Sequence, residues 1–438
     1  MIEPAQPSVA NDASLKSALR KASLRIVPLL AVAYGVAIMD RVNISFASLQ
    51  MNRDLHFSAT VYGFGAGIFF LSYAVCEVPS NLALVHFGAR RWLARIMVTW
   101  GLLAMAMIFV RTPFQFYAVR FLLGMAEAGF FPGVVFYLMQ WFPQETRARA
   151  ISRFYVSSPI SAMVMGAIAG TLLGMQGRLS LAGWQWLFLV EGFPAILLGV
   201  VFLIFLPDDP THAAWLTKSE QTAILKAVPP PASSTHSIGP ALRDPRVWLL
   251  GLFMFCMLGT NYAFLFSEPA IVQKITGFTV NRTGFVIAAV NLLGALALVA
   301  NGIVSDRRRA PFAHALPGCF LTAAGFLILG TTASANLAIG AVILINVGMW
   351  SMQGPLWAIG TSYFTGRTAA AAIAAINTIA IVGGFVGPYL MGIAKDLTGN
   401  YQRGLLMMCP PMLLAAVILL YLRPAKVSVV TAAVPSLP

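Results

Sequence analysis

The sequence predicts an all-α membrane protein in which twelve transmembrane helices form two six-helix bundles. The first observation is composition: 58% of the 438 residues are hydrophobic and 10% are charged, whereas a soluble domain has about 25% charged residues. The second is that apolar stretches of about 20 residues, the length that crosses a hydrocarbon core of about 30 Å as a helix, recur along the chain. The third is a weak internal repeat between the two halves.

The expected spans are separated by short polar breaks, except for one long break in the middle of the chain. An N-terminal segment (1–25) precedes the first bundle (26–206), a linker (207–246) leads to the second bundle (247–422), and a tail (423–438) follows. The linker contains "PDDP" and "VPPPASSTHSIGP", which cannot span a membrane and need not pack. The stretch "LKSALRKASLRI" before the first span predicts a short basic helix on the membrane surface. The spans are 26–47, 60–84, 93–110, 114–141, 152–175, 185–206, 247–271, 283–304, 312–333, 337–360, 367–392 and 401–422.

Basic residues are distributed unevenly between the two sides of these spans. Most of the 29 Lys and Arg residues fall before span 1, in alternate loops, in the linker and after span 12. Cytoplasmic loops carry such an excess, so we expect both termini and the linker in the cytoplasm and the chain in the inner membrane. The net charge of +14 therefore reflects topology and the lipid bilayer, with no nucleic-acid partner.

The repeat is carried by two pairs of segments at nearly the same offset. "HFGARRWLA" after span 2 matches "VSDRRRAPFA" after span 8, and "WFPQETRARAIS" after span 4 matches "YFTGRTAAAAIA" after span 10. Internal repeats of this kind are typical of secondary transporters whose halves rock about a midplane site. The glycine-rich stretches 63–67, 166–174 and 383–392 predict close helix packing, with or without motion.

Ionisable residues inside the spans are few, and such residues usually face a cavity or a partner because burial of a charge is costly. Asp40 and Arg41 lie in span 1, and Arg120 and Glu127 lie seven residues apart on one face of span 4. The simplest arrangement pairs each carboxylate with an arginine of the other span. We expect Asp40 and Glu127 to carry protons and Arg41 and Arg120 to bind a substrate carboxylate. Two static ion pairs joining the spans remain the alternative.

Three further acids and several polar side chains complete the candidates. Glu77 lies near the inner end of span 2, where gating or packing is expected, and Glu191 and Glu268 are expected near the outer surface in solvated or interfacial roles. Tyr73, Ser157, Ser158, Gln353, Trp357 and Asn377 are candidate substrate contacts, and interhelical hydrogen bonds are the alternative for each.

The chain resembles the anion:cation symporter branch of the major facilitator superfamily through "MDRVNIS", "CEVPSNLALVHFGARRWLARIMVTWG", "RFLLGMAEAGFFPGVVFYLMQWFPQETRARAIS" and "GGFVGPYLMG". That branch includes permeases for tartrate, sugar acids and aromatic carboxylates. The resemblance implies protonation at Asp40 and Glu127, substrate binding and coupling at Arg41 and Arg120, and substrate contact at Tyr73.

Departures from the branch affect the gate and the substrate. The loop after span 2 has Val85 where the wider superfamily carries an acid, while the loop after span 8 keeps Asp306 and Arg307. We assign these two residues, with Arg90 and Arg91, to gating. Ile381 replaces an asparagine of many relatives, which weakens the case for a sugar acid and leaves tartrate or an aromatic acid open.

These observations predict a monomeric proton-coupled symporter of a small organic anion, with an exchanger or an uncoupled facilitator as the alternative. The sequence contains no metal-ligand pair and no nucleophile–base arrangement within a span, so we expect neither an enzyme nor a metal or other cofactor. Efflux of cations or drugs by the same fold is another rival. It should favour an acidic cavity without unpaired arginines, whereas these spans contain Arg41 and Arg120. A non-transporting sensor is a further alternative.

Overall fold

The computed structural model describes residues 9–228, 243–363 and 369–422, and all regular elements of these residues are helices. The first half contains α1 (Val9–Arg25), α2 (Val27–Asp54), α3 (Ala59–Phe87), α4 (Ala89–Ala106), η1 (Met107–Phe109), α5 (Pro113–Glu127), α6 (Phe130–Trp141), α7 (Gln144–Tyr155), α8 (Ser157–Leu173), η2 (Arg178–Ser180), α9 (Gly183–Phe205), η3 (Pro210–His212) and α10 (Lys218–Ala227). The second half contains α12 (Pro245–Thr276), α13 (Val280–Arg308), α14 (Pro311–Thr331), α15 (Ala335–Tyr363), α16 (Ala369–Thr398), α17 (Gln402–Leu406) and α18 (Cys409–Leu422).

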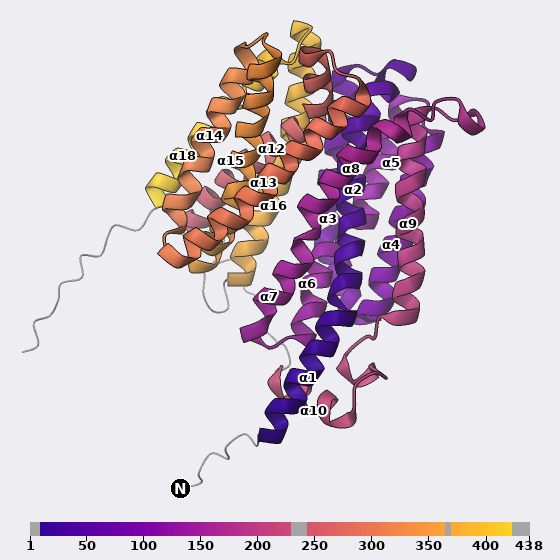
Figure 1. Cartoon of the computed structure of the whole chain (residues 1–438), viewed down its shortest axis with the longest axis vertical. Helices are drawn as coiled ribbons and strands as arrows, with labels where there is room; N and C mark the ends of the chain where they lie inside the picture. The colour runs from indigo at the N-terminus through magenta and orange to yellow at the C-terminus, as the bar shows by residue number, and fades with distance from the viewer. Residues whose placement is uncertain (1–8, 229–242, 364–368, 423–438) are drawn as a thin grey trace, which may run out of the picture.

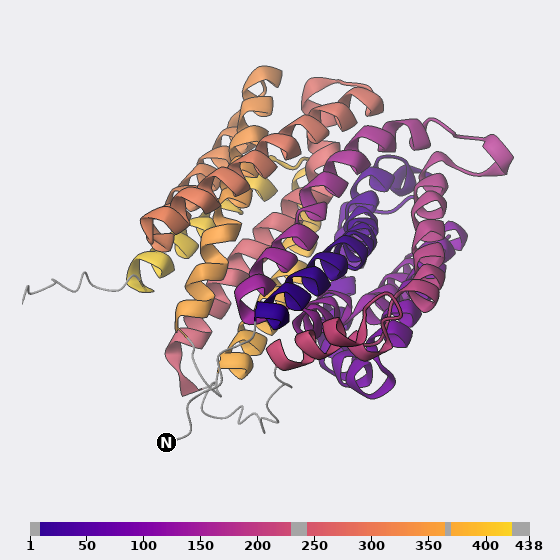
Figure 2. The ribbon, with the colours of Figure 1, turned by 60° about the horizontal axis from the view of Figure 1, so that its bottom comes forward.

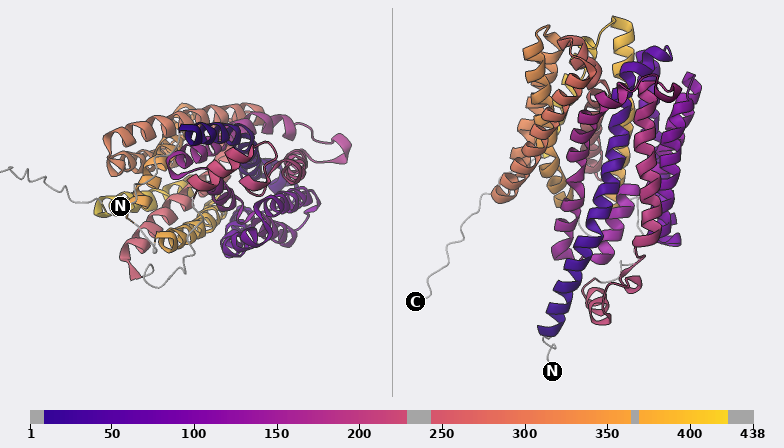
Figure 3. Two further views of the ribbon diagram at one scale, coloured as in Figure 1. Left: turned by 90° about the horizontal axis from the view of Figure 1, so that it is seen from below. Right: turned by 45° about the vertical axis from the view of Figure 1, so that its right-hand side comes forward.

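Within the described residues, twelve helical segments are long and apolar enough to cross a membrane. Each overlaps one expected span, so the predicted fold class and the number of spans are confirmed. The spans form two groups, α2–α9 and α12–α18, which lie side by side in Figure 1 and in the end-on view of Figure 3. Each group has a cluster of buried apolar side chains that comes mainly from its own helices.

The two bundles approach each other most closely near one end, the upper end of Figure 1. A Cβ on Gly67 of α3 would lie 2.8 Å from the Phe385 carbonyl oxygen of α16, and one on Gly166 of α8 would lie 2.9 Å from the Gly284 carbonyl oxygen of α13. Asp396 of α16 also accepts hydrogen bonds from the first backbone amides of α3. The close packing predicted from the glycine-rich stretches is therefore confirmed, and it joins the two bundles.

Span 4 is not one continuous helix. α5 ends at Glu127 and α6 begins at Phe130, because Gly129 adopts a left-handed conformation with φ of 85°. A Cβ at Gly129 would also collide with Ser80 of α3. The break places the Glu127 carboxylate at a helix end inside the bundle.

The N-terminal segment differs from expectation, and a helix of the linker packs against it. α1 continues into α2 as a single helical span from Ala13 to Asp54, so it projects along the axis of the first span, as the right-hand view of Figure 3 shows, and does not lie flat. α10 of the linker lies beside α1 in Figure 2. Glu220 of α10 accepts hydrogen bonds from Ser17 at 2.7 Å and Lys21 at 2.8 Å, so this helix, which lies between the two Pro-rich stretches of the linker, packs on α1. Residues 229–242, which contain most of the second stretch, lie outside the described residues.

Candidate functional site

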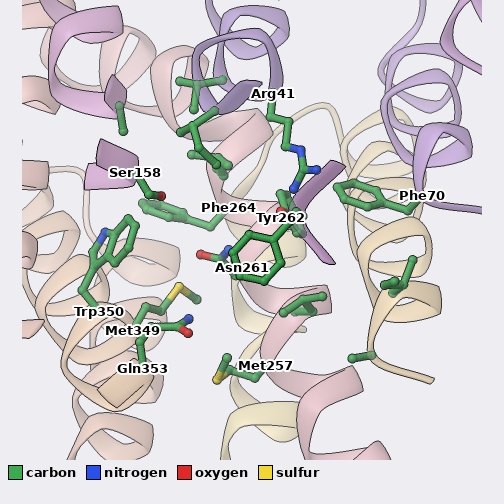
Figure 4. A pocket seen from close by; sticks show the side chains of 18 of the residues that line it. Arg41, Phe70, Ser158, Met257, Asn261, Tyr262, Phe264, Met349, Trp350 and Gln353 are labelled. Atoms are coloured by element: carbon green, nitrogen blue, oxygen red, sulfur yellow. The ribbon is translucent and has the colours of Figure 1, made fainter. Parts of the chain in front are cut away.

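A cavity of about 260 Å³ lies between the two bundles and takes lining residues from both. α2, α3, α6, α7 and α8 supply one wall, and α12, α13, α15 and α16 supply the other. Figure 4 shows side chains from both walls pointing into this space. The volume is just below the range of about 300–1,000 Å³ that is typical of ligand pockets, which suits a small substrate.

Among the described residues, Arg41 is the one Lys or Arg side chain that lines the cavity. Its Nε donates to Oε1 of Glu127 at 2.9 Å, its Nη2 forms an ion pair with the same oxygen, and 17% of the side chain is exposed. The guanidinium also lies 5.4 Å from the ring centroid of Tyr73 and 5.7 Å from that of Phe69. Two rings and one carboxylate therefore hold the guanidinium at the cavity surface, where Figure 4 shows it.

Glu127 lies behind Arg41 and does not line the cavity. Its side chain is 1% exposed, and Oε2 has no hydrogen-bond partner in the described part of the chain. Arg41 therefore separates Glu127 from the cavity. This pair is one of the two expected from the sequence, and it is present.

Asp40 points away from the cavity into the first bundle. It is 2% exposed; Oδ1 accepts a hydrogen bond of 3.5 Å from Asn43, and Oδ2 has no partner among the described residues. Asn43 also donates to Glu191 of α9, which is itself 2% exposed. The expectation that Glu191 is solvated or interfacial is therefore wrong, because its carboxylate is buried beside Asn43.

Arg120 forms no ion pair with Asp40, so the second expected pair is absent. Its guanidinium is fully buried and donates to the backbone carbonyl oxygens of Gly65 at 3.4 Å and Ala66 at 3.3 Å on α3. It also lies 4.9 Å from the ring centroid of Phe69. Arg120 does not contribute to the cavity lining, although Phe69 contacts both guanidinium groups.

The wall from the second bundle contains polar residues that the sequence reasoning missed. Glu268 of α12 lines the cavity, is 2% exposed, and accepts a hydrogen bond of 3.1 Å from Asn346 of α15. Asn261 and Asn291 line the same wall. The placement of Glu268 near the outer surface is therefore wrong. The signal in the sequence is an amide inside an apolar span, as at Asn261, Asn291 and Asn346.

The remaining predicted contacts are divided between the cavity and its surroundings. Tyr73, Ser158, Gln353 and Asn377 line the cavity. Ser157 instead donates to the Phe154 carbonyl oxygen at 2.8 Å and is not part of the lining. The side chain of Trp357 lies outside the described residues.

The predicted gating residues lie in two places. Glu77 lines the cavity and accepts hydrogen bonds of 3.2 Å and 3.3 Å from Asn377 of the opposite bundle. The other four lie outside the cavity lining: Arg90 forms an ion pair of 3.5 Å with Asp208, while Arg91, Asp306 and Arg307 are exposed.

Twelve spans in two bundles, around a shared cavity that polar side chains line in part, define a class, the multi-pass membrane transporters. The family follows from the sequence comparison, because residues 30–388 match the Major Facilitator Superfamily and the chain belongs to it. The chain is a transporter and not an enzyme.

Several relatives match almost the whole chain. A "Putative tartrate transporter" of Agrobacterium vitis is 42% identical over 418 residues, covering 94% of this chain and 93% of the relative. The "Quinolone resistance transporter" of Acinetobacter baumannii is 36% identical, covering 94% and 96%.

Solved structures of low sequence identity share the fold. A bacterial homologue of the human lysosomal transporter Spinster has a TM-score of 0.74 at 14% identity, covering 90% of this chain and 96% of that chain. The xylose transporter XylE from E. coli has a TM-score of 0.73 at 14% identity, covering 93% and 99%.

Proposed function

We propose that this transporter imports a small organic anion together with protons by alternating access. The observation that carries the proposal is the position of Arg41, whose guanidinium reaches the cavity while a buried carboxylate, Glu127, pairs with it from behind. The names of the relatives from Agrobacterium vitis, 42% identical to this chain, support an anion such as tartrate. A sugar acid or an aromatic carboxylate carries the same carboxylate group, which Arg41 can bind.

Coupling follows from the competition of two carboxylates for one guanidinium. When Glu127 is ionised it satisfies Arg41, and an incoming substrate carboxylate meets a neutral pair. When Glu127 is protonated, Arg41 is free to hold the substrate with two parallel hydrogen bonds. Leaving Arg41 without either partner costs about 3–5 kcal/mol, so proton and anion bind together and leave together.

Asp40 supplies a second proton site in this scheme. The carboxylate is buried, it has a single hydrogen bond of 3.5 Å from Asn43, and one oxygen is unbonded within the described residues. An ionised carboxylate with so few partners is costly in an apolar bundle. Arg120 remains charged and braces α5 against α3 through the carbonyl oxygens of Gly65 and Ala66.

Alternating access needs a closed end and an opening end. The glycine contacts and the bonds to Asp396 close one end, and we assign that end to the outside because basic residues concentrate at the other. Both termini and the linker are then cytoplasmic. On the inner side of the cavity, Glu77 and Asn377 connect the bundles and form an inner gate. Changes in the contacts of Arg90, Arg91, Asp306 and Arg307 accompany its opening.

The alternative is an anion exchanger or an uncoupled facilitator of the same fold. In proteoliposomes, the proposed symporter concentrates its substrate when a pH gradient is imposed. Glu127→Gln should lose this accumulation and retain counterflow of labelled against unlabelled substrate, because exchange requires reorientation of the loaded carrier only. Glu145→Gln, which changes an exposed acid at the start of α7, is the matched control. Gradient-driven accumulation by Glu127→Gln at the control's level would exclude Glu127 as the essential proton carrier.

A further inference from the structure

A second cavity, of about 360 Å³, lies between α1 and α7 and is separate from the central one. α1 contributes Arg20 and Ser23 to it, and α7 contributes Arg149 and Arg153. Thr146 adds another hydroxyl group, and apolar side chains such as Phe142 form the rest of the lining. No residue is shared with the lining of the central cavity. We refer to this second cavity as the basic crevice.

The basic crevice carries positive charge that the described part of the protein does not neutralise. Its lining contains three arginines and no carboxylate. Arg153 donates to Ser23 at 2.8 Å, which is a neutral partner, and neither Arg20 nor Arg149 has an ion pair with any described residue. By contrast, Lys21 on the same helix pairs with Glu220. The ligand that complements the crevice is therefore an anion.

Two rows of exposed apolar side chains begin at the crevice and run away from it toward the middle of the spans. One row starts at Leu24, which itself lines the crevice, and continues along α2; the other starts three residues after Arg153 and continues along α8. Residues four apart lie on one helix face, and α2 and α8 are packed together where Gly35 meets Ser161. The rows are Leu24, Pro28 and Val32, and Val156, Ile160 and Val164.

We propose that the basic crevice binds the phosphate headgroup of an anionic phospholipid of the cytoplasmic leaflet, with the acyl chains along these two apolar rows. Basic pockets at the cytoplasmic ends of transmembrane helices attract anionic headgroups. A free phosphate ion would use the arginines and leave the apolar rows uncovered, which is why the lipid is the better fit. The bound lipid joins α1 and α2 to α7 and α8, the helices that carry Arg41 and Ser158 to the central cavity.

The test measures lipid binding to the purified full-length protein. Delipidated protein is titrated with phosphatidylglycerol or phosphatidylcholine in mixed micelles, and bound lipid is counted by native mass spectrometry. The crevice variant is Arg149→Gln with Arg153→Gln. Its matched control is Lys218→Gln with Lys226→Gln, which removes two exposed charges from α10. Arg20→Gln tests the opposite wall of the crevice without changing α7.

Phosphatidylglycerol should bind more tightly than phosphatidylcholine, and added salt should weaken its binding. Each basic side chain near a headgroup contributes about fivefold, so the double arginine variant should bind about 30-fold more weakly and Arg20→Gln about fivefold more weakly. The lysine control should bind as the unchanged protein does. Glycerol phosphate and inorganic phosphate, which lack acyl chains, should not displace the lipid at matched concentration.

Two outcomes overturn the proposal. Equal losses in the arginine variant and the lysine control would show that the crevice has no special affinity for the lipid. Displacement of phosphatidylglycerol by inorganic phosphate at matched concentration would instead identify a site for a free phosphate group. The proposal does not depend on proton coupling, because binding is measured without transport.

Discussion

Replacing Arg41 with lysine keeps the charge in the cavity and removes the planar, two-point grip. In the structure Arg41 uses Nε and Nη2 toward one carboxylate and lies over the ring of Tyr73 at 5.4 Å. A lysine ammonium is a point charge. It cannot reproduce the two planar N–H donors of the guanidinium or its stacking on the Tyr73 ring. The expected result is weaker substrate binding with the positive charge retained.

The size of the effect follows from the lost contacts. One hydrogen bond to a charged group contributes about 1.5–3 kcal/mol, and the cation–π contact contributes about 0.5–1 kcal/mol. Their sum of about 2–4 kcal/mol corresponds to a loss of affinity between about 30-fold and about 1,000-fold. The magnitude applies to a substrate held by both nitrogens.

The assay has two stages. A panel of carboxylates is first screened for thermal stabilisation of the purified protein, and the best ligand is then titrated calorimetrically against Arg41→Lys. Arg111→Lys is the control, because Arg111 is exposed and donates to the carbonyl oxygens of Ile108 and Val110. An affinity of Arg41→Lys within about threefold of the unchanged protein, less than 1 kcal/mol, would refute the two-point grip and leave Arg41 as a structural partner of Glu127.

Three further predictions test other parts of the molecule. Glu268→Ala leaves Asn346 without its carboxylate partner. Calorimetry should show that it weakens the binding of hydroxylated carboxylates about tenfold more than the binding of unsubstituted ones. Equal losses of affinity for the two kinds of ligand would contradict a contact between Glu268 and the ligand. Burial raises the pKa of Glu220, but hydrogen bonds from Lys21, Ser17 and the Thr217 backbone outweigh it and lower the pKa to about 2. This depressed pKa stabilises the docking of α10 on α1 above about pH 4.3. This stabilisation of the α10–α1 contact is lost as pH falls toward 2. Faster amide hydrogen exchange of α10 at low pH should show the loss, and Glu220→Gln should abolish the pH dependence. Cysteines at Arg178 and Lys226 should be labelled from outside and from the cytoplasm respectively, and the reverse pattern would invert the topology.

Local sequence features predicted much of the first bundle's site. Arg41 and Glu127 are recognisable because charges inside apolar spans are rare, and their pairing follows from the need of a buried charge for a partner. The partner of Arg120 could not be predicted in the same way. Arg120 lies about 10 Å along the helix from Glu127. At that height in the bundle its guanidinium donates to the backbone carbonyl oxygens of Gly65 and Ala66 on α3.

The expected depth of Glu268 is wrong because its helix is longer than the expected span. The expected span ends at 271, whereas α12 continues to Thr276, which moves Glu268 more than one turn further from the helix end. The expected position of Glu191 is wrong for a different reason. Its surroundings are set by Asn43 on α2, a residue 148 positions away in the chain, and no local pattern indicates that contact.

The sequence by itself determined the properties that depend on short stretches of chain. Spans of about 20 apolar residues must be helices in a bilayer, since their backbone groups have no other partners there, and the glycine-rich stretches allow close backbone contact wherever they meet. Only the tertiary structure decided which stretches meet. It placed Arg41 at the cavity with Glu127 behind it, turned Asp40 and Arg120 away from it, and brought Glu268 and Glu77 to its walls. The physical reason is that the partner of a buried polar group is set by how helices distant in sequence pack, and that packing depends on the whole fold.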